Sequence, residues 1–193
     1  EFASESPEVS AAIEKALIQF EDLGARIEEV QMESLAFAGF ANQLISLCES
    51  SAFHRGYLLE QPENYGEAFR IRLYLAALIT SDDYVQAQRA RTLARRDFLE
   101  TLNKVDLLVT PTWRTTAPAF VDLNPFANYE SPSFVTPFNL AGVPAISIPC
   151  GFSESGLPIG LQIAGKPFDE QTVLRAAYSY QQAAGWYKHR PPM

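Results

Sequence analysis

Hydrophobic residues recur with the period of an α-helix over the first hundred residues of the chain. Ser6-Pro7-Glu8 is typical of a helix start, apolar residues follow at helical spacing, and Gly24 predicts the end of this first helix. Three more helices are predicted over 33–59, 69–78 and 81–104, with a loop around 61–66 where proline, asparagine and glycine interrupt the pattern. Ser81-Asp82-Asp83 is expected to cap the last of these helices.

Strands are predicted where short apolar or alternating runs are bounded by glycine or proline. Residues 25–30 alternate β-branched and charged side chains directly after the first helix, and residues 105–110 form an apolar run before Pro111. Residues 144–150 and 157–164 predict a hairpin. A short helix is expected over 134–140 and a closing helix over 169–185. Together these elements indicate an α/β fold with mixed strand directions.

Two features of the pattern leave alternatives open. Residues 112–133 are irregular and rich in proline and aromatic residues, which is typical of a binding loop or lid, although a loop that covers the edge of the fold fits equally. The helix predicted over 81–104 carries a run of arginines, which indicates a solvated face, with a substrate-facing arginine as the alternative. These arginines are Arg89, Arg91, Arg95 and Arg96.

Composition narrows the class of protein. Hydrophobic residues make up 47% of the 193 residues, which suffices for a buried core. The net charge of -8 argues against nucleic acid as a partner, and no apolar run approaches the roughly 18 residues of a membrane span. Two widely separated cysteines favour a reducing, cytoplasmic location. Because the chain begins Glu1-Phe2-Ala3 without an initiator methionine, we expect a processed chain or part of a longer protein.

The sequence holds no recognisable catalytic constellation. Only His54 and His189 are present, without the spacing of metal ligands, so neither a metal ion nor a cofactor is expected. Ser147 lies inside an apolar strand and outside any nucleophile motif, and we interpret it as a hydrogen-bonded filler. Cys150 is interpreted as a buried structural thiol. A hydrolase that uses Cys150 as its nucleophile stays open as an alternative.

One long segment nevertheless resembles a known family. Residues 134–151, with the sequence FVTPFNLAGVPAISIPCG, resemble the characteristic C-terminal block of the amidase signature family. The similarity continues through GLPIGLQIAG at 156–165 to Leu174, and DLLVTPT at 106–112 is similar to the family's strand and turn before its substrate loop. The resemblance covers nearly the whole chain and is specific because the pattern fixes many positions.

The resemblance implies a large mixed sheet with helices on both faces, and chemistry by a lysine, a cis-configured serine and a nucleophilic serine. Because the glycine- and serine-rich signature that holds these serines is absent, no catalytic residue is assigned. Residues 1–193 are therefore expected to be the C-terminal portion of an amidase domain, inactive alone, with the upstream half of the same enzyme as its partner and a small-molecule amide as substrate. By the same resemblance the candidate substrate-binding residues are Thr136, Phe138, Asn139 and Trp113, with bracing of the sheet as the alternative for Asn139.

Further alternatives concern the branch of the family. The family includes the A subunit of the glutamine-dependent aminoacyl-tRNA amidotransferase, whose pattern has an acid shortly before the T-x-P step. Ser131, Pro132 and Ser133 hold that place here and Glu130 is displaced, so a general amidase, or a relative acting on ureas or carbamoyl groups, fits better. A non-catalytic amidase-like binding or assembly module is another possibility. A sheet without its upstream strands exposes an apolar edge, so self-association is expected.

Overall fold

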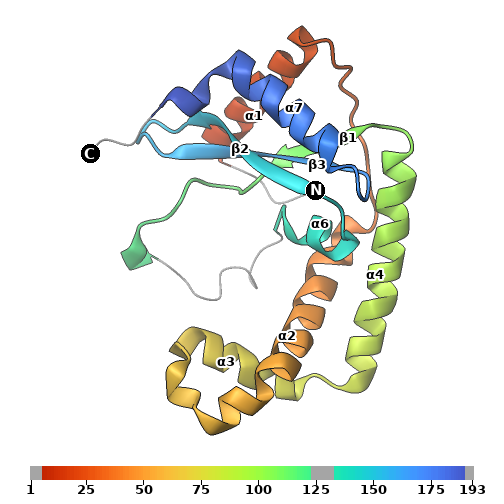
Figure 1. Cartoon of the computed structure of the whole chain (residues 1–193), viewed down its shortest axis with the longest axis vertical. Coiled ribbons are helices and arrows are strands. Elements are labelled where there is room, and N and C mark those ends of the chain that lie inside the picture. The colour runs from red at the N-terminus through yellow and green to blue at the C-terminus, as the bar shows by residue number, and fades with distance from the viewer. Residues whose placement is uncertain (1–5, 123–132, 190–193) are drawn as a thin grey trace.

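The computed structural model describes residues 6–122 and 133–189 of the chain. Figure 1 shows two regions, a three-stranded sheet with helices against it and a helical arm that extends away from the sheet. The strands are β1 (Leu107–Pro111), β2 (Ala145–Phe152) and β3 (Pro158–Gly165), in the order β1-β3-β2, and both pairings are antiparallel. The predicted hairpin and the strand before it are thereby confirmed, as is the α/β class.

The helical arm comprises α2, α3 and the far end of α4 (Figure 1). Its elements are α2 (Leu35–Glu60), η1 (Pro62–Asn64), α3 (Glu67–Leu75), η2 (Ala76–Leu78) and α4 (Ser81–Leu102), which confirms the three helices predicted there. The contact between α2 and α4 is built from small buried side chains, namely Ala38, Ala41, Ala87 and Ala94. Alanines let the two helix backbones approach closely, so α4 returns alongside α2 to the sheet.

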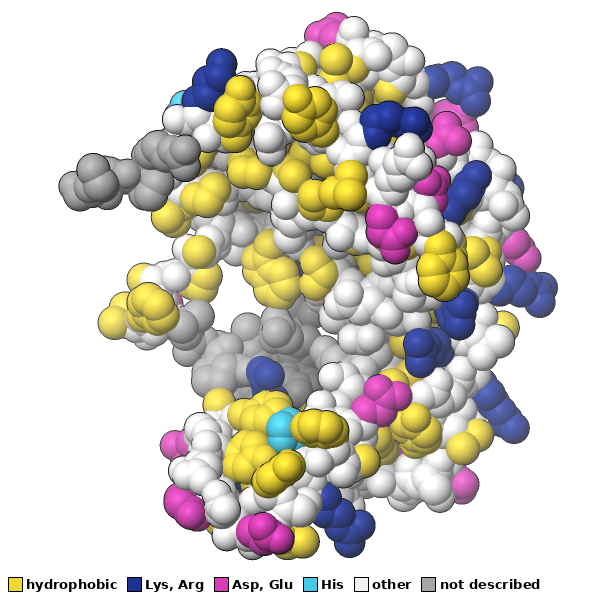
Figure 2. Space-filling model, in the orientation of Figure 1, with side chains coloured by type: hydrophobic (Ala, Val, Ile, Leu, Met, Phe, Trp, Pro, Cys, Tyr) yellow, Lys and Arg dark blue, Asp and Glu magenta, His cyan; other side chains and the backbone are white. Residues whose placement is uncertain are grey.

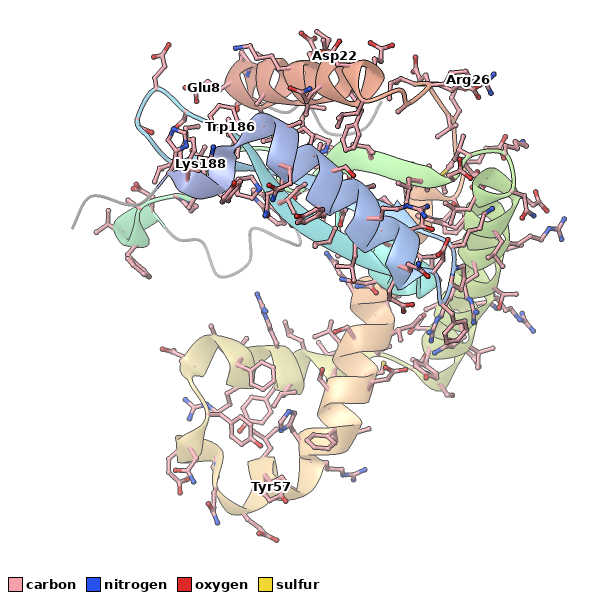
Figure 3. All side chains as sticks on the ribbon, turned by 45° about the horizontal axis from the view of Figure 1, so that its top comes forward. Glu8, Asp22, Arg26, Tyr57, Trp186 and Lys188 are labelled. Carbon is pink, nitrogen blue, oxygen red and sulfur yellow. The ribbon has the colours of Figure 1, made fainter. Side chains whose placement is uncertain are left out.

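Helices cover both faces of the sheet. Helices α1 (Pro7–Asp22) and α7 (Glu170–Ala184) pack on one face, where β2 and β3 contribute Ile148, Cys150, Ile159, Leu161 and Ile163 to a continuous core. Helices α4 and α6 (Thr136–Ala141) cover one end of the other face, around Leu108 and Ala164. Two short 3-10 helices, η3 (Phe120–Asp122) and η4 (Trp186–Lys188), complete the described elements. In Figure 3, Trp186 and Lys188 lie at the same end of the sheet region as Glu8, at the start of α1.

Two local predictions are wrong. Residues 25–30 form no strand; they lie exposed beyond α1, apart from the half-buried Val30, and Arg26 pairs with Glu28 (Figure 3). Alternation of side chains with a period of two does not make a strand unless a neighbouring strand pairs with it. In the described part of the chain β1 pairs only with β3, so no strand lies beside residues 25–30. The cap of α4 is Thr80 instead of Ser81, because Asp83 lies three residues after Thr80 and completes a capping box with it.

No helix in the two described stretches of the chain is long and apolar enough to cross a membrane.

Candidate functional site

Beyond the end covered by α4 and α6, the second face of the sheet carries polar and small residues. Side chains two apart in a strand share a face, so the registers of both strand pairs define rows across this face. Thr110, Gln162 and Ser147 form one row. In the next row Gly160 pairs with Pro149, and the backbone N–H of Thr112 donates to the Gly160 carbonyl at 2.9 Å. We call these two rows the polar face.

Gln162, in the middle strand, is the most buried side chain of the polar face, with only 5% of its surface exposed. Its amide nitrogen donates to the hydroxyl of Thr110 at 2.9 Å and to the carbonyl of Phe134 at 3.1 Å. A side-chain amide has two N–H donors, and both find an acceptor here. Gln162 therefore connects strand β1 to the segment that leads into α6.

Ser147 and Thr112 form the second hydrogen-bonded group on this face. Their hydroxyl oxygens lie 2.6 Å apart, and the pair is exposed. A Cβ atom at Gly160 would lie 2.8 Å from the Thr112 hydroxyl and 3.0 Å from the Ser147 hydroxyl. The hydrogen bond between the two hydroxyls therefore requires a glycine at position 160. Ser147 is hydrogen-bonded, as predicted, but it lies on the exposed face of its strand and not among the apolar residues.

The three predicted substrate-binding residues of α6 have different surroundings. Phe138 is 5% exposed and its ring packs edge-on against Phe98 of α4, with ring centroids 5.2 Å apart. Thr136 is half-buried, and its hydroxyl lies against α2 at Gly39. Asn139 is exposed and lines a surface groove between α2 and α4. The structure thus places the three on one short helix without bringing their side chains to one point.

Trp113, the fourth predicted residue, follows β1 and is 36% exposed. It lies three residues after Thr110 of β1. Because Gln162 bonds to both Thr110 and Phe134, it holds β1, which precedes Trp113, close to the segment that precedes α6. Downstream of Trp113 the described part of the loop exposes Phe120 and Val121. Residues 123–132, which include Glu130, Ser131 and Pro132, lie outside the described residues. The binding-loop and substrate-binding roles stay predictions.

The arginines of α4 divide into two groups. Arg91 is half-buried, and its Nε donates to the carbonyl of Leu140 in the last turn of α6 at 3.2 Å. A cation at this position also suits the negative end of a helix. Arg89, Arg95 and Arg96 are exposed, as expected for a solvated helix face. Arg91 thus holds the C-terminal end of α6. Gln162 contacts the segment that precedes the same helix.

The polar face contains no group that transfers protons at neutral pH, because its side chains are hydroxyls and an amide. Cys150 lies on the opposite face, 3% exposed, where its thiol donates to the Ile159 carbonyl and burial raises its pKa to about 11. His54 lies in the arm, hydrogen-bonded to Tyr65 at 3.0 Å, and His189 packs beside Phe152. A thiol of high pKa is a poor nucleophile, so the described residues can bind and orient a molecule but do not form a nucleophile–base pair.

No three His, Cys, Asp or Glu side chains in the described ranges, 6–122 and 133–189, lie close enough together to hold a metal ion.

The arm exposes several large hydrophobic side chains. Figure 2 shows hydrophobic side chains gathered on the surface of the arm. Phe53, Leu59 and Leu78 of the arm are each at least 75% exposed. Tyr57 lies at the far end of the arm, away from the sheet (Figure 3). Exposed apolar side chains gathered in one place are unusual on the surface of an isolated protein.

Sequence reasoning missed Gln162. The signal that could have found it is the alternation within β3, where Ile159, Leu161 and Ile163 share the apolar face and Gln162 is the one polar side chain of the strand. A buried polar side chain needs a partner. The identity of the partners, Thr110 and Phe134, is not visible in the sequence because they lie 52 and 28 residues away.

Comparison with known proteins places these features in a family. The model of the family described as Amidase matches residues 2–174. The A subunit of glutamyl-tRNA(Gln) amidotransferase from Methanosarcina mazei is 37% identical over 214 aligned residues, which cover 96% of this chain and 44% of the relative. The protein of the same name from Oceanobacillus iheyensis is 39% identical and covers 97% of this chain and 44% of the relative. The chain thus spans less than half the length of the curated relatives it matches.

Solved structures agree with this likeness. The crystal structure of the A subunit of glutamyl-tRNA(Gln) amidotransferase from Thermotoga maritima superposes with a TM-score of 0.77 at 29% identity, over 93% of this chain and 40% of that protein. The structure of 6-aminohexanoate cyclic dimer hydrolase gives a TM-score of 0.79 at 25% identity, over 97% of this chain and 43% of that enzyme. The fold is therefore similar both to a hydrolase and to part of an amidotransferase.

Proposed function

This chain belongs to the amidase family, and from that premise we propose that it forms the C-terminal portion of a serine-based amide-bond hydrolase. In this proposal it contributes scaffold and one wall of the substrate pocket, and the upstream half of the same enzyme contributes the catalytic serines and lysine. The observation that carries the proposal is the polar face, where Gln162 bonds the segment before α6 to the sheet and no side chain can act as acid or base. Arg91 of α4 holds the other end of α6. Such a face can hold a substrate in place but needs a partner for the chemistry.

The surface of the arm supports the same proposal. The hydrophobic side chains gathered on the arm in Figure 2 are suited to contact with the rest of an amidase domain, and the relatives are more than twice as long as the aligned part of this chain. Without that part we propose that the chain self-associates, because the same side chains remain exposed to water. Light scattering of the isolated chain measures this directly. A monodisperse monomer over a wide concentration range would contradict self-association.

The experiment that tests the function supplies the missing half. The chain is expressed alone and together with the preceding region of its own gene, and ammonia release is measured from a panel of small amides. We expect no activity from the chain alone and hydrolysis from the combination. Absence of activity with every amide in the combined protein would sink the proposal and favour a non-catalytic amidase-like module. Replacing Cys150 by alanine in the active combination tests the cysteine alternative, and we expect unchanged activity.

The pocket wall can be tested in the same combined protein. We expect Trp113→Ala and Thr136→Ala to raise the KM of the amide substrate, because both are proposed to contact it. Asn64→Ala is the matched control, since Asn64 is an exposed polar residue of η1 in the arm. If neither pocket variant moved KM more than the control, the two residues would have no place in the pocket wall.

A second candidate function is that of a glutamine amidotransferase A subunit, favoured by the 35–39% identity to proteins of that name. The sequence favours a general amidase, because serine and proline stand where that branch has its acid. Ammonia release from glutamine, compared with release from simple amides, distinguishes the two.

For either candidate we propose a cytoplasmic location and no nucleic-acid contact through this portion. The net charge of -8 and two cysteines that form no disulfide support both statements.

A further inference from the structure

We propose that Gln162 is a positioning residue, which fixes the segment leading into α6 against the sheet and thereby sets the place of the pocket wall. The effect on substrate rests on the proposed function, whereas the effect on the position of α6 is a property of the chain itself. Gln162 needs no contact with substrate in this role. It acts through the backbone of Phe134.

Three segments that are distant in the sequence meet at the amide of Gln162. Its nitrogen donates to Thr110 in β1 and to the Phe134 carbonyl before α6, at 2.9 and 3.1 Å. The side chain comes from the middle strand, whose backbone is paired on both sides. Gln162 is therefore anchored rigidly, and the irregular segment before α6 is held by it.

Burial makes these bonds hard to replace. Gln162 is 5% exposed and Phe134 is 7% exposed, so water has little access to the amide or to the carbonyl. A buried donor or acceptor that loses its partner costs roughly 1 to 3 kcal/mol, more than the net worth of the bond itself. Removing the amide takes this donor away from the Phe134 carbonyl.

Movement of Phe134 passes directly to α6, because few residues separate them. The backbone N–H of Val135 donates to the hydroxyl of Ser133 at 3.2 Å, which makes a tight turn around Phe134, and α6 begins at Thr136. The other end of α6 is held independently by Arg91. Loss of the Gln162 bond is therefore expected to loosen the first turn of α6 more than its last.

The test is amide hydrogen exchange of the isolated chain with Gln162→Met, which keeps the length of the side chain and removes both donors. Within residues 135–139 the informative amides are those of Val135 and Asn139, which donate to the Ser133 hydroxyl and the Val135 carbonyl. We expect roughly ten-fold or greater loss of their protection, by the cost of an unsatisfied buried group, and unchanged protection in α7. Ser147→Ala is the matched control, because Ser147 lies in the same row and bonds to Thr112 instead of Gln162. Equal protection of residues 135–139 in the wild type, Gln162→Met and Ser147→Ala would overturn the proposal.

In a second variant, lowering the pH restores a hydrogen-bond donor at position 162. Gln162→Glu has the shape of glutamine, and burial raises the pKa of a carboxyl group there. The ionised carboxylate cannot donate to Phe134, whereas the protonated acid can, so we expect protection of residues 135–139 to recover as pH falls from 8 to 5. Gln162→Met has no such recovery. Identical behaviour of the two variants at both pH values would count against a hydrogen bond as the cause.

Two measurements remain decisive even if Gln162→Met fails to fold. In the wild-type chain the Nε2 protons of Gln162 should exchange much more slowly than those of Gln31, which is exposed, and equal rates would overturn the proposal. In the combined protein of the functional test, Gln162→Glu at pH 8 should raise KM about ten-fold with a smaller change in kcat. A combined protein without any activity refutes the proposed function and leaves the exchange results standing.

Discussion

The apolar face and the polar face of the sheet come from the same three strands but differ in the side chains they hold and in what covers them. On the apolar face, branched aliphatic residues such as Leu161 and Ile163 are fully buried beneath α1 and α7. On the polar face, Ser147 is exposed, Thr112 is half-buried, and their hydroxyls are bonded to one another. The difference indicates that the first face supplies most of the apolar burial of the sheet, whereas the second keeps hydrogen-bonding groups at its surface.

The largest effect is expected from Leu161→Ala on the apolar face. Leu161 is 0% exposed, so its removal leaves a cavity and should lower the free energy of unfolding by about 2 to 5 kcal/mol. Urea denaturation measures this change. Leu174→Ala is the control, because Leu174 of α7 is 56% exposed and the same truncation there should cost less than about 0.5 kcal/mol. Equal losses for both variants would mean that α7 does not cover this face in solution.

Gly165→Ala tests how tightly α7 packs on the sheet. A Cβ atom at Gly165 would lie 2.7 Å from a methyl carbon of Val173, so α7 must shift and the variant should lose about 1 to 3 kcal/mol of stability. Gly56→Ala in α2 is the control. Nothing lies within 4 Å of a Cβ atom there, and the change should stabilise the helix by roughly 0.5 to 1 kcal/mol. Thermal denaturation of both variants is the measurement, and a neutral Gly165→Ala would contradict close packing.

Because of Cys150, the free energy of unfolding is expected to depend on pH. Burial raises the pKa of its thiol from 9.0 to about 11, so the unfolded chain loses this proton at lower pH than the folded chain. The contribution of Cys150 to stability is therefore complete below pH 9 and is lost as pH rises toward about 11. Urea denaturation at pH 8, 9 and 10 should show this loss in the wild type and a smaller loss in Cys150→Ala. A steeper loss in the variant would show that another group is responsible.

The smallest effect is expected at the Ser147–Thr112 hydroxyl pair of the polar face. Ser147→Ala and Thr112→Val each remove one partner of an exposed hydroxyl pair, so each should cost no more than about 1 kcal/mol. The double variant should cost no more than the sum of the two, because they share one hydrogen bond. Urea denaturation of the wild type, the two single variants and the double variant gives the coupling energy between the two hydroxyls. A cost of several kcal/mol for Ser147→Ala would show that this face is part of the core, and the contrast between the faces would fail.

The arm shows why a correct helix prediction leaves the function of a surface undefined. Its helices follow from apolar residues at helical spacing, and the structure confirms them. The spacing does not distinguish residues that pack within the chain, such as Ile45, from residues that stay exposed, such as Phe53. That distinction depends on which helices are neighbours.

Local chemistry explains what could be read from the sequence. Helix α1 follows from its proline start and glycine end, and the hairpin of β2 and β3 follows from two apolar runs around a glycine turn, because such patterns act within a few residues. The family resemblance likewise depends on consecutive residues. The strand predicted at 25–30 failed because a strand needs a partner, which neighbouring residues cannot supply.

The candidate site required the fold. Thr110, Phe134 and Gln162 come from three separate segments, and only the pairing of β1 with β3 and the packing of α6 bring them within hydrogen-bonding distance. The sequence alone was enough for most of the elements and for the family, since both depend on short runs of consecutive residues. Burial, and with it the strength of a hydrogen bond or the pKa of a thiol, depends on atoms contributed from elsewhere in the chain, and therefore became visible only in the folded molecule.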